Sequence, residues 1–161
     1  MLIWSLKSFE QLTPSELYAL LRLRSEVFVV EQNCVFLDMD NQDQDSYHLM
    51  GWGAGADNEQ EASGSRLLAY TRLVPPGQIY SEMSIGRVVT SPAARGTGAG
   101  RALMEESIRR CFALFGSGPI RIGAQQYLER FYASLGFVTV SDPYLEDGIP
   151  HVSMLRAVEL R

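Results

Sequence analysis

Short apolar stretches and longer segments with helical periodicity follow one another along the chain. The apolar stretches predict β-strands at residues 2–6, 48–52, 67–74, 83–90, 120–124, 137–140 and 152–155. Residues 53–65, between two of these strands, are small, polar and rich in glycine, as in a solvated hairpin loop. This alternation predicts a single α/β domain over residues 1–161 with about seven strands.

Helical segments are predicted at three places between these strands. Thr13 as N-cap, Pro14 at the first helical position and Glu16 three residues after the cap predict a helix from Pro14 to about residue 29. A second helix follows the glycines near residue 100, with an apolar stripe formed by Met104, Ile108, Cys111, Phe112 and Phe115. A third helix ends at Gly136 and has apolar residues at Leu128, Phe131, Tyr132 and Leu135.

Composition and charge exclude several classes of protein. The chain has 161 residues, 46% of them hydrophobic, which suits one compact domain with a buried core. Lysine and arginine total 14 against 19 aspartate and glutamate, and no long basic run occurs, which argues against a dedicated nucleic-acid binder. The first residues lack the apolar core of a signal peptide, and no apolar run reaches the roughly 20 residues of a membrane helix. We therefore expect a cytoplasmic protein without membrane contacts.

Cysteine, histidine and aspartate show no metal-binding spacing. Cys34 and Cys111 form no CxxC pair and predict free thiols in a reducing compartment, and the cysteines and histidines do not match a zinc site. A calcium loop is excluded because Asp43 stands where that loop needs glycine and Leu49 where it needs glutamate. We expect instead a solvated acidic loop that lines the substrate mouth and favours cationic amines, formed by Asp38, Asp40, Asp43 and Asp45.

Residues 95–101 read RGTGAGR and lie between a predicted strand and a predicted helix. Successive backbone N–H groups of such a loop can converge on a phosphate at the N-terminus of the helix. A P-loop requires lysine after its last glycine, and a dinucleotide fingerprint requires GxGxxG after the first strand of a βαβ unit. Neither pattern matches. The pattern R-x-x-G-x-G, with charge from Arg95 and Arg101, suits a pyrophosphate.

Two motifs resemble the GNAT superfamily of acetyl-CoA-dependent N-acetyltransferases. The first is VVTSP at residues 88–92 followed by RGTGAGR at residues 95–101, and the second is FYASLGF at residues 131–137. Further segments, at residues 24–32, 45–49 and 146–151, resemble the ElaA-like branch of the superfamily. The resemblance covers nearly the whole chain and implies the GNAT fold, a mixed and mostly antiparallel sheet flanked by helices.

The resemblance implies how acetyl-CoA binds as a co-substrate, without a metal. The glycine loop would hold the pyrophosphate, and the edge of the strand before it would hydrogen-bond the pantetheine arm as an added strand does. At the end of the next strand, Gln125 stands near the place of an asparagine that is frequent in the family. The implied cofactor-binding residues are Val88, Val89, Thr90, Arg95, Gly96, Thr97, Gly98, Ala99, Gly100, Arg101 and Gln125.

Acetyl transfer to an amine requires a proton acceptor and a donor near the leaving sulfur. A lysine-like amine has a pKa near 10.4, so only about 10⁻³ of it is neutral at pH 7. The resemblance implies that Tyr132 is the general acid, although its place on an apolar stripe also suits a core residue. Candidate bases are Glu82, His151 and His48, and a water chain is a further alternative.

The sequence thus predicts an acetyl-CoA-dependent N-acetyltransferase that acts directly on a primary amine. A non-catalytic coenzyme A-binding sensor or scaffold would keep the glycine loop without needing Tyr132 or a base. The expected partners are acetyl-CoA and an amine of a small molecule, peptide or protein, with polyamines, aminoglycosides and amino acids among the alternatives. A homodimer is compatible with the sequence, and nucleic acid is not an expected partner.

Overall fold

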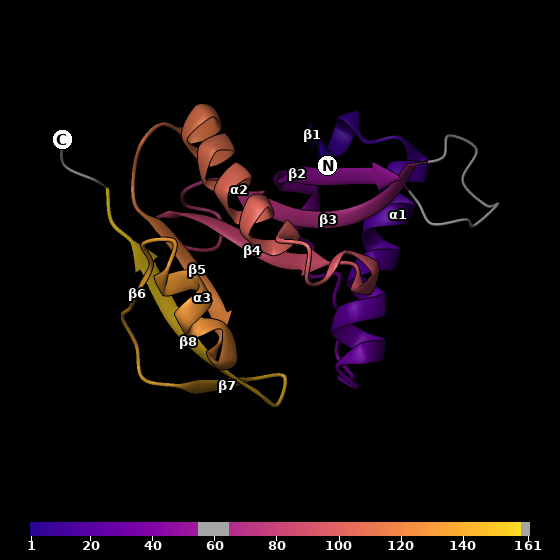
Figure 1. Ribbon diagram of the computed structural model, residues 1–161. Helices are drawn as coiled ribbons and strands as arrows, with labels where there is room; N and C mark the ends of the chain where they lie inside the picture. The colour runs from indigo at the N-terminus through magenta and orange to yellow at the C-terminus, as the bar shows by residue number, and fades with distance from the viewer. Residues whose placement is uncertain (55–64, 159–161) are drawn as a thin grey trace.

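The computed structural model describes residues 1–54 and 65–158, and within them eight strands form one sheet (Figure 1). The strands are β1 (Ile3–Ser8), β2 (Tyr47–Ala54), β3 (Ser65–Val74), β4 (Met83–Thr90), β5 (Ile120–Gln125), β6 (Val138–Thr139), β7 (Tyr144–Glu146) and β8 (Ile149–Arg156). Their order is β1-β2-β3-β4-β5-β8-β6, and β7 also pairs with β8. The pair β4–β5 is parallel and the other described pairs are antiparallel, so the sheet is mixed and mostly antiparallel.

Helical segments connect these strands. They are α1 (Pro14–Arg24), the π-helix η2 (Ser25–Glu31), α2 (Ala99–Phe115) and α3 (Glu129–Ala133), with 3-10 turns at Phe9–Gln11, Asp43–Asp45, Pro92–Ala94 and Gln126–Leu128. The predicted capping box of α1 is present, because Thr13 Oγ1 accepts from the Glu16 N–H and Glu16 Oε1 accepts from the Thr13 N–H. The helix predicted from Pro14 to about residue 29 is confirmed, with its last part wound as a π-helix. None of the described helices is long and apolar enough to cross a membrane.

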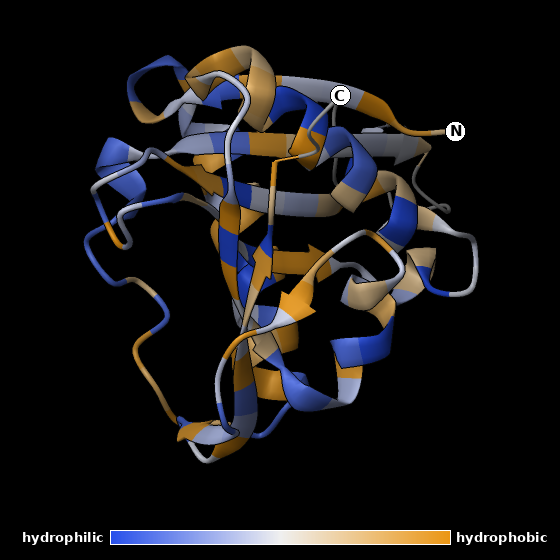
Figure 2. Ribbon diagram, turned by 90° about the vertical axis from the view of Figure 1, so that its left-hand side faces the viewer, coloured by the Kyte–Doolittle hydropathy of each residue, from blue (hydrophilic) through white to orange (hydrophobic). Residues whose placement is uncertain are grey.

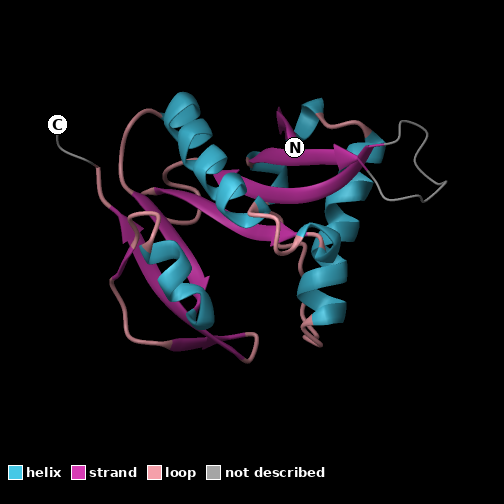
Figure 3. Cartoon of the chain, viewed as in Figure 1, coloured by secondary structure: helices cyan, strands magenta, loops and turns pink. Residues whose placement is uncertain are grey.

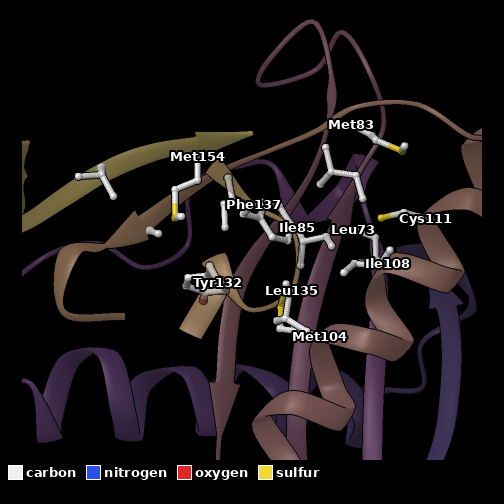
Figure 4. Close-up of a cluster of buried hydrophobic side chains, with 14 residues drawn as sticks. Leu73, Met83, Ile85, Met104, Ile108, Cys111, Tyr132, Leu135, Phe137 and Met154 are labelled. Atoms are coloured by element: carbon white, nitrogen blue, oxygen red, sulfur yellow. The ribbon is translucent and has the colours of Figure 1, made fainter. Parts of the chain in front are cut away.

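Helices cover both faces of the sheet because neighbouring residues on a strand point to opposite sides. Met50 of β2 packs with Leu20 of α1, whereas the adjacent Leu49 packs with Leu103 of α2. Hydrophobic and hydrophilic bands accordingly alternate along the strands (Figure 2), and α2 crosses in front of β3 and β4 (Figure 3). A larger core joins α2 and α3 to β4, β5 and β8 (Figure 4).

One strand was not predicted, so the count rises from about seven to eight. All residues of β7 are exposed, and a strand buried on neither face has no hydrophobic alternation to reveal it. The other predicted strands are observed with ends shifted by a few residues. The hairpin loop predicted at 53–65 lies largely outside the described residues.

β4 and β5 pair only at their first residues and then separate. Met83 pairs with Ile120 and Ser84 pairs with Arg121, after which the strands diverge like the arms of a V (Figure 1). The edge of β4 beyond Ser84 therefore has no β5 partner in the described pairing. Its backbone N–H and C=O groups can pair with a ligand instead.

A β-bulge in β4 lies where the strands diverge. Tyr70 of β3 pairs with Val89 and Arg72 with Gly86, so one residue of β3 lies opposite two residues of β4. Arg87, in the bulge, has a left-handed φ of 50°. Such a bulge increases the local twist of a strand and re-aims its side chains, which here bends the second half of β4.

Candidate active site

The space between the diverging strands is a cavity of about 790 Å³. β4 and the glycine loop form one wall, β5 and α3 form another, and η2, the segment after it and the β7–β8 turn complete the lining. Several predicted site residues meet there, namely Val88, Val89, Thr90, Arg95, Gly100, Gln125, Tyr132 and His151. Others belong to the same loop without lining the cavity, namely Gly96, Thr97, Gly98, Ala99 and Arg101.

Left-handed backbone at two glycines leads the loop into the N-terminus of α2. The φ angle is 76° at Gly96 and 81° at Gly98, a region that residues with a Cβ rarely adopt. The first N–H groups of a helix have no intrahelical partner and bear partial positive charge, so they can bind an anion. A Cβ at Gly100 would lie 4.0 Å from Phe131 Cζ, and both residues line the cavity. A Cβ at residue 100 therefore fits without strain, and a larger side chain there would extend along the cavity wall.

Both arginines of the loop have carboxylate partners. Arg95 Nη2 donates to Glu31 Oε1 of η2 at 2.5 Å, and this hydrogen bond raises the pKa of Arg95. Arg101 Nε lies 3.1 Å from Glu105 Oε1. These four side chains are about half exposed, so solvent screens both pairs and a phosphate can replace either carboxylate.

Gln125 faces the cavity from the end of β5 and hydrogen-bonds Gln32, which follows η2. Gln125 Nε2 donates to Gln32 Oε1 at 3.3 Å, and Gln32 Nε2 donates to Gln125 Oε1 at 3.5 Å. Together with the pair between Glu31 and Arg95, this bridge ties the end of η2 to both walls of the cavity. A ligand that passes between β4 and β5 at this point would compete with these contacts.

Tyr132 belongs to the hydrophobic core and also lines the cavity. Its position is therefore compatible with both roles that the sequence left open, core residue and general acid. It is 5% exposed, and its ring makes edge contacts with Phe131 and Phe137. Figure 4 shows Tyr132 among the buried side chains of the core. Burial raises the pKa of its hydroxyl, which is therefore protonated at neutral pH. Within residues 1–54 and 65–158 this hydroxyl has no hydrogen-bond partner, so it can donate to a ligand in the cavity.

His151 lines the cavity, and its two ring nitrogens have different neighbours. Its Nδ1 lies 2.7 Å from the carbonyl oxygen of Ile149, and because a carbonyl only accepts, Nδ1 carries the proton. In the neutral ring Nε2 then has the lone pair. Nε2 lies 3.4 Å from Glu146 Oε2, and the ring stacks on Tyr144 of β7. This tautomer leaves Nε2 free to accept a proton.

Glu82 lies at the closed end of the V, away from the residues that line the cavity. Arg121 Nη2 donates to Glu82 Oε2 at 2.9 Å, and Ser81 Oγ donates to Glu82 Oε1 at 2.9 Å. The hydrogen bond from Arg121 is the main cause that lowers the pKa of Glu82 to about 2. A carboxylate with so low a pKa is a weak base at neutral pH.

His48, another candidate base, lies in a buried polar network instead of the cavity. Its Nε2 donates to the carbonyl oxygen of Asp43 at 2.9 Å, and its Nδ1 accepts from the Tyr70 hydroxyl at 2.7 Å. Burial lowers the pKa of His48. Both ring nitrogens are occupied by structural contacts, so the arrangement indicates a packing role.

The acidic loop is not solvated, which corrects the sequence-based expectation. Asp38 and Asp43 are buried, and Arg24 binds both carboxylates at 2.8 Å. Arg72 binds Asp43 at 3.0 Å from β3. Burial alone would raise the pKa of Asp43, but hydrogen bonds and charge from the two arginines lower it. The two arginines belong to α1 and β3, so the composition of the loop alone does not reveal them.

Asp40 lines the cavity, although its charge is neutralised. Arg72 Nη1 lies 2.7 Å from its carboxylate, and Arg87 Nη2 lies 3.3 Å from it. Arg87 also pairs with Asp38 at 2.9 Å. The bulge in β4 is therefore tied to this loop, which forms part of the cavity wall. Asp45 is exposed, so only this member of the predicted loop is solvated.

Both cysteines are free, as predicted, and both are buried. Cys34 lines the cavity and its Sγ donates to the carbonyl oxygen of Asp147 at 3.2 Å. Cys111 lies in the core, where burial raises the pKa of its thiol to about 12. In the described part of the chain, no group of three or more His, Cys, Asp or Glu side chains is placed to hold a metal ion.

Several polar residues of the cavity were not identified as site residues from the sequence. Glu31 and Gln32 contact the predicted cofactor residues, Arg87 lies in the β-bulge, and Glu146 faces His151. Glu31, Gln32 and Glu146 lie in segments whose resemblance to the ElaA-like branch gives them no chemical role, and Arg87 is an ordinary strand residue in the sequence. Sheet pairing and the path of η2 bring these residues together.

A family model and individual known proteins match most of the chain. The family model described as an acetyltransferase (GNAT) domain matches residues 67–157. Protein ElaA of Escherichia coli is 39% identical over 160 residues, 98% of each chain, and a UPF0039 protein of Synechocystis is 42% identical over 152 residues, 94% of this chain and 93% of that one.

Two solved structures are similar over nearly their full length. An acyl-CoA N-acyltransferase from Pseudomonas aeruginosa is 45% identical with a TM-score of 0.87, covering 98% of this chain and 100% of its own. Escherichia coli ElaA is 39% identical with a TM-score of 0.83, covering 97% and 99%. The fold is therefore that of the acyl-CoA N-acyltransferases.

Proposed function

Because the chain belongs to the GNAT acetyltransferase family, we propose that it transfers an acetyl group from acetyl-CoA directly to a primary amine. The observation that carries this proposal is that Gly100, Tyr132 and His151 line one cavity. Gly100 gives access to the glycine loop, Tyr132 is a protonated hydrogen-bond donor, and His151 is a proton acceptor. Amide formation from a thioester needs such a donor and such an acceptor. The free thiols Cys34 and Cys111 suit the reducing cytoplasm, where we place the enzyme.

The cavity lining suits each part of coenzyme A. The first N–H groups of α2, with Arg95 and Arg101, would hold the pyrophosphate. The unpaired edge of β4 would hydrogen-bond the amides of the pantetheine arm, with Gln125 opposite. When bound, acetyl-CoA supplies an acetyl group on a thioester whose sulfur is a good leaving group.

In this proposal His151 is the base and Tyr132 the donor. Nε2 of His151 takes one proton from the acceptor amine, whose lone pair is then free to attack the carbonyl carbon. Tyr132 donates a hydrogen bond to the sulfur as the C–S bond breaks. Burial raises the pKa of Tyr132 further above that of a thiol, about 8.5, so its hydroxyl stabilises the thiolate mainly by hydrogen bonding.

Glu82 is the weaker candidate for the base. Its ion pair with Arg121 holds its pKa at about 2, and it does not line the cavity. Replacement of Glu82 by glutamine should therefore change turnover much less than replacement of His151 by asparagine.

Release of free coenzyme A thiol from acetyl-CoA tests the proposal. The purified protein is assayed against spermidine, an aminoglycoside, lysine and a short peptide, beside Tyr132→Phe and the exposed control Tyr18→Phe. Amine-dependent release should fall about 10²-fold in Tyr132→Phe alone, as on loss of one preorganised donor, with unchanged affinity for coenzyme A by calorimetry.

Other outcomes would redirect the assignment. Tight acetyl-CoA binding without release from any amine would favour a non-catalytic sensor. No binding would remove coenzyme A as the ligand of the glycine loop, and full activity of Tyr132→Phe would remove this tyrosine as the donor.

A further inference from the structure

Four carboxylates line the cavity, and they differ in their partners. Glu31 and Asp40 are each bound by arginine. Glu146 and Asp147 lie at the turn between β7 and β8. In the part of the chain that the structure describes, Glu146 forms an ion pair with neither arginine nor lysine, and the basic group within ion-pair distance is the imidazole of His151.

When the ring of His151 is neutral, it and Glu146 present hydrogen-bond acceptors to each other. The Nδ1 proton is donated to the carbonyl of Ile149, so the Nε2 lone pair of the neutral ring points to a carboxylate oxygen 3.4 Å away. In that state the two acceptors repel each other unless a proton donor lies beside both. A protonated primary amine has three N–H groups and can donate one to each of these atoms.

The surroundings of the pair favour a cation. Tyr144 of β7 stacks on the imidazole with ring centroids 5.9 Å apart, and neutral Gln125 of β5 pairs opposite His151 in the sheet. Asp147, the next residue after Glu146, adds a second carboxylate to the lining. An ammonium group at this position would meet negative charge that no neighbouring cation in the described turn neutralises.

We propose that Glu146 binds the ammonium group of the acceptor beside Nε2 of His151. Glu146 is then a positioning residue of the reaction proposed above, on which this inference rests. It selects amines that are protonated at neutral pH, such as alkylamines and lysine-like groups, over arylamines, which are neutral there.

The proton and electron changes balance in the following order. The ammonium donates one proton to Nε2 of His151, which gives imidazolium beside the Glu146 carboxylate and a neutral amine. The amine lone pair forms the C–N bond, and the C–S bond breaks with its electron pair on sulfur. The thiolate takes the second proton from nitrogen, and the imidazolium returns its proton to solvent. The products are the amide, coenzyme A and one proton.

Steady-state kinetics of Glu146→Gln, with Asp142→Asn as the control, test this role. Both changes remove one negative charge, and Asp142 is exposed just before β7 and does not line the cavity. In Glu146→Gln the KM for the alkylamine should rise about tenfold, as expected when one hydrogen bond between charged groups is weakened. The kcat should change less than KM, and affinity for coenzyme A, measured by calorimetry, should not change. Asp142→Asn should leave all three values unchanged.

Each contrary result overturns a different statement. An active wild-type enzyme with an unchanged amine KM in Glu146→Gln would overturn the role of Glu146 and leave the proposed function standing. An equal loss of affinity for amine and coenzyme A would also overturn it, because it would indicate a structural role. A wild-type protein that acetylates no amine would overturn both statements.

Discussion

The two ends of the cavity are built in different ways. The end that we propose for coenzyme A, called the cofactor end, comes from one continuous segment, the end of β4, the glycine loop and the start of α2, and it offers mainly backbone groups. The end that we propose for the amine, called the acceptor end, is assembled from the loop after η2, from β5 and from the β7–β8 turn, and it offers side chains. Backbone recognition tolerates many side chains but needs glycine at set positions, whereas side-chain recognition can be re-specified by single substitutions.

The two ends also differ in how their loops are held. The glycine loop is shaped by left-handed φ angles at Gly96 and Gly98, with half-exposed ion pairs around it. The loop at residues 33–42 is held by a buried network in which Arg24 and Arg72 bind Asp38, Asp40 and Asp43. Charge should therefore matter to the stability of the acceptor end far more than to that of the cofactor end.

The largest effect should come from breaking the buried network. Asp43→Asn removes a carboxylate that binds two arginines and leaves buried positive charge, so the free energy of unfolding should fall by about 3–5 kcal/mol. Asp45→Asn, two residues away and exposed, makes the same charge change and should have little effect. Urea denaturation followed by circular dichroism measures both. Equal stabilities of the two variants would show that the network is not a stabilising feature.

A substitution at the cofactor end should act on binding instead. Gly100→Val adds a branched side chain at the cavity wall, where a Cβ has its nearest neighbour at 4.0 Å, so affinity for coenzyme A should fall about 10–100-fold, equivalent to one or two lost charge-assisted hydrogen bonds. Val88→Ala should retain affinity because β4 would contact the pantetheine through its backbone. Calorimetry with coenzyme A gives both values. Equal weakening in the two variants would contradict a backbone-based site.

Acid should loosen the acceptor end before the cofactor end. Burial would raise the pKa of Asp40, but hydrogen bonds and charge from Arg72 and Arg87 lower it to about 2, below its ordinary value of 3.8. A lowered folded-state pKa gives stability that is complete above about pH 4 and is lost as the pH falls toward 2. Hydrogen exchange of residues 33–42 should therefore accelerate over this range, ahead of residues 95–101. Faster exchange of the glycine loop first would refute the comparison.

The smallest expected effect is a gain in affinity for coenzyme A, and it concerns Glu31. Glu31 forms an exposed ion pair with Arg95. Glu31→Gln should therefore free the guanidinium and tighten binding of coenzyme A about two- to fivefold. Glu26→Gln on the same helical segment removes the same charge without that ion pair and serves as the control. The gain should shrink in high salt. Weaker binding in Glu31→Gln would mean that Glu31 orients Arg95 toward the phosphates.

Local signals predicted most of the fold and the position of the glycine loop. The Thr13 capping box, the apolar stripe of α2 and the glycines before it act within a few residues, so their effect can be inferred without knowing the rest of the chain. β7 escaped prediction because its residues are exposed on both faces. The solvated acidic loop was predicted wrongly because local composition says nothing about Arg24 or Arg72 arriving from other elements.

By itself, the sequence determined the order of strands and helices, the position of the glycine loop and the membership of Tyr132 in an apolar stripe. Tertiary structure decided which polar groups face one another. It brought Gln32 to Gln125, directed His151 into the cavity with Glu146 beside it, and tied Glu82 to Arg121 at the closed end of the V. The physical reason is range: backbone conformation and periodicity are set by near neighbours, whereas the environment of an ionisable group depends on residues that only the folded sheet brings within a few ångströms.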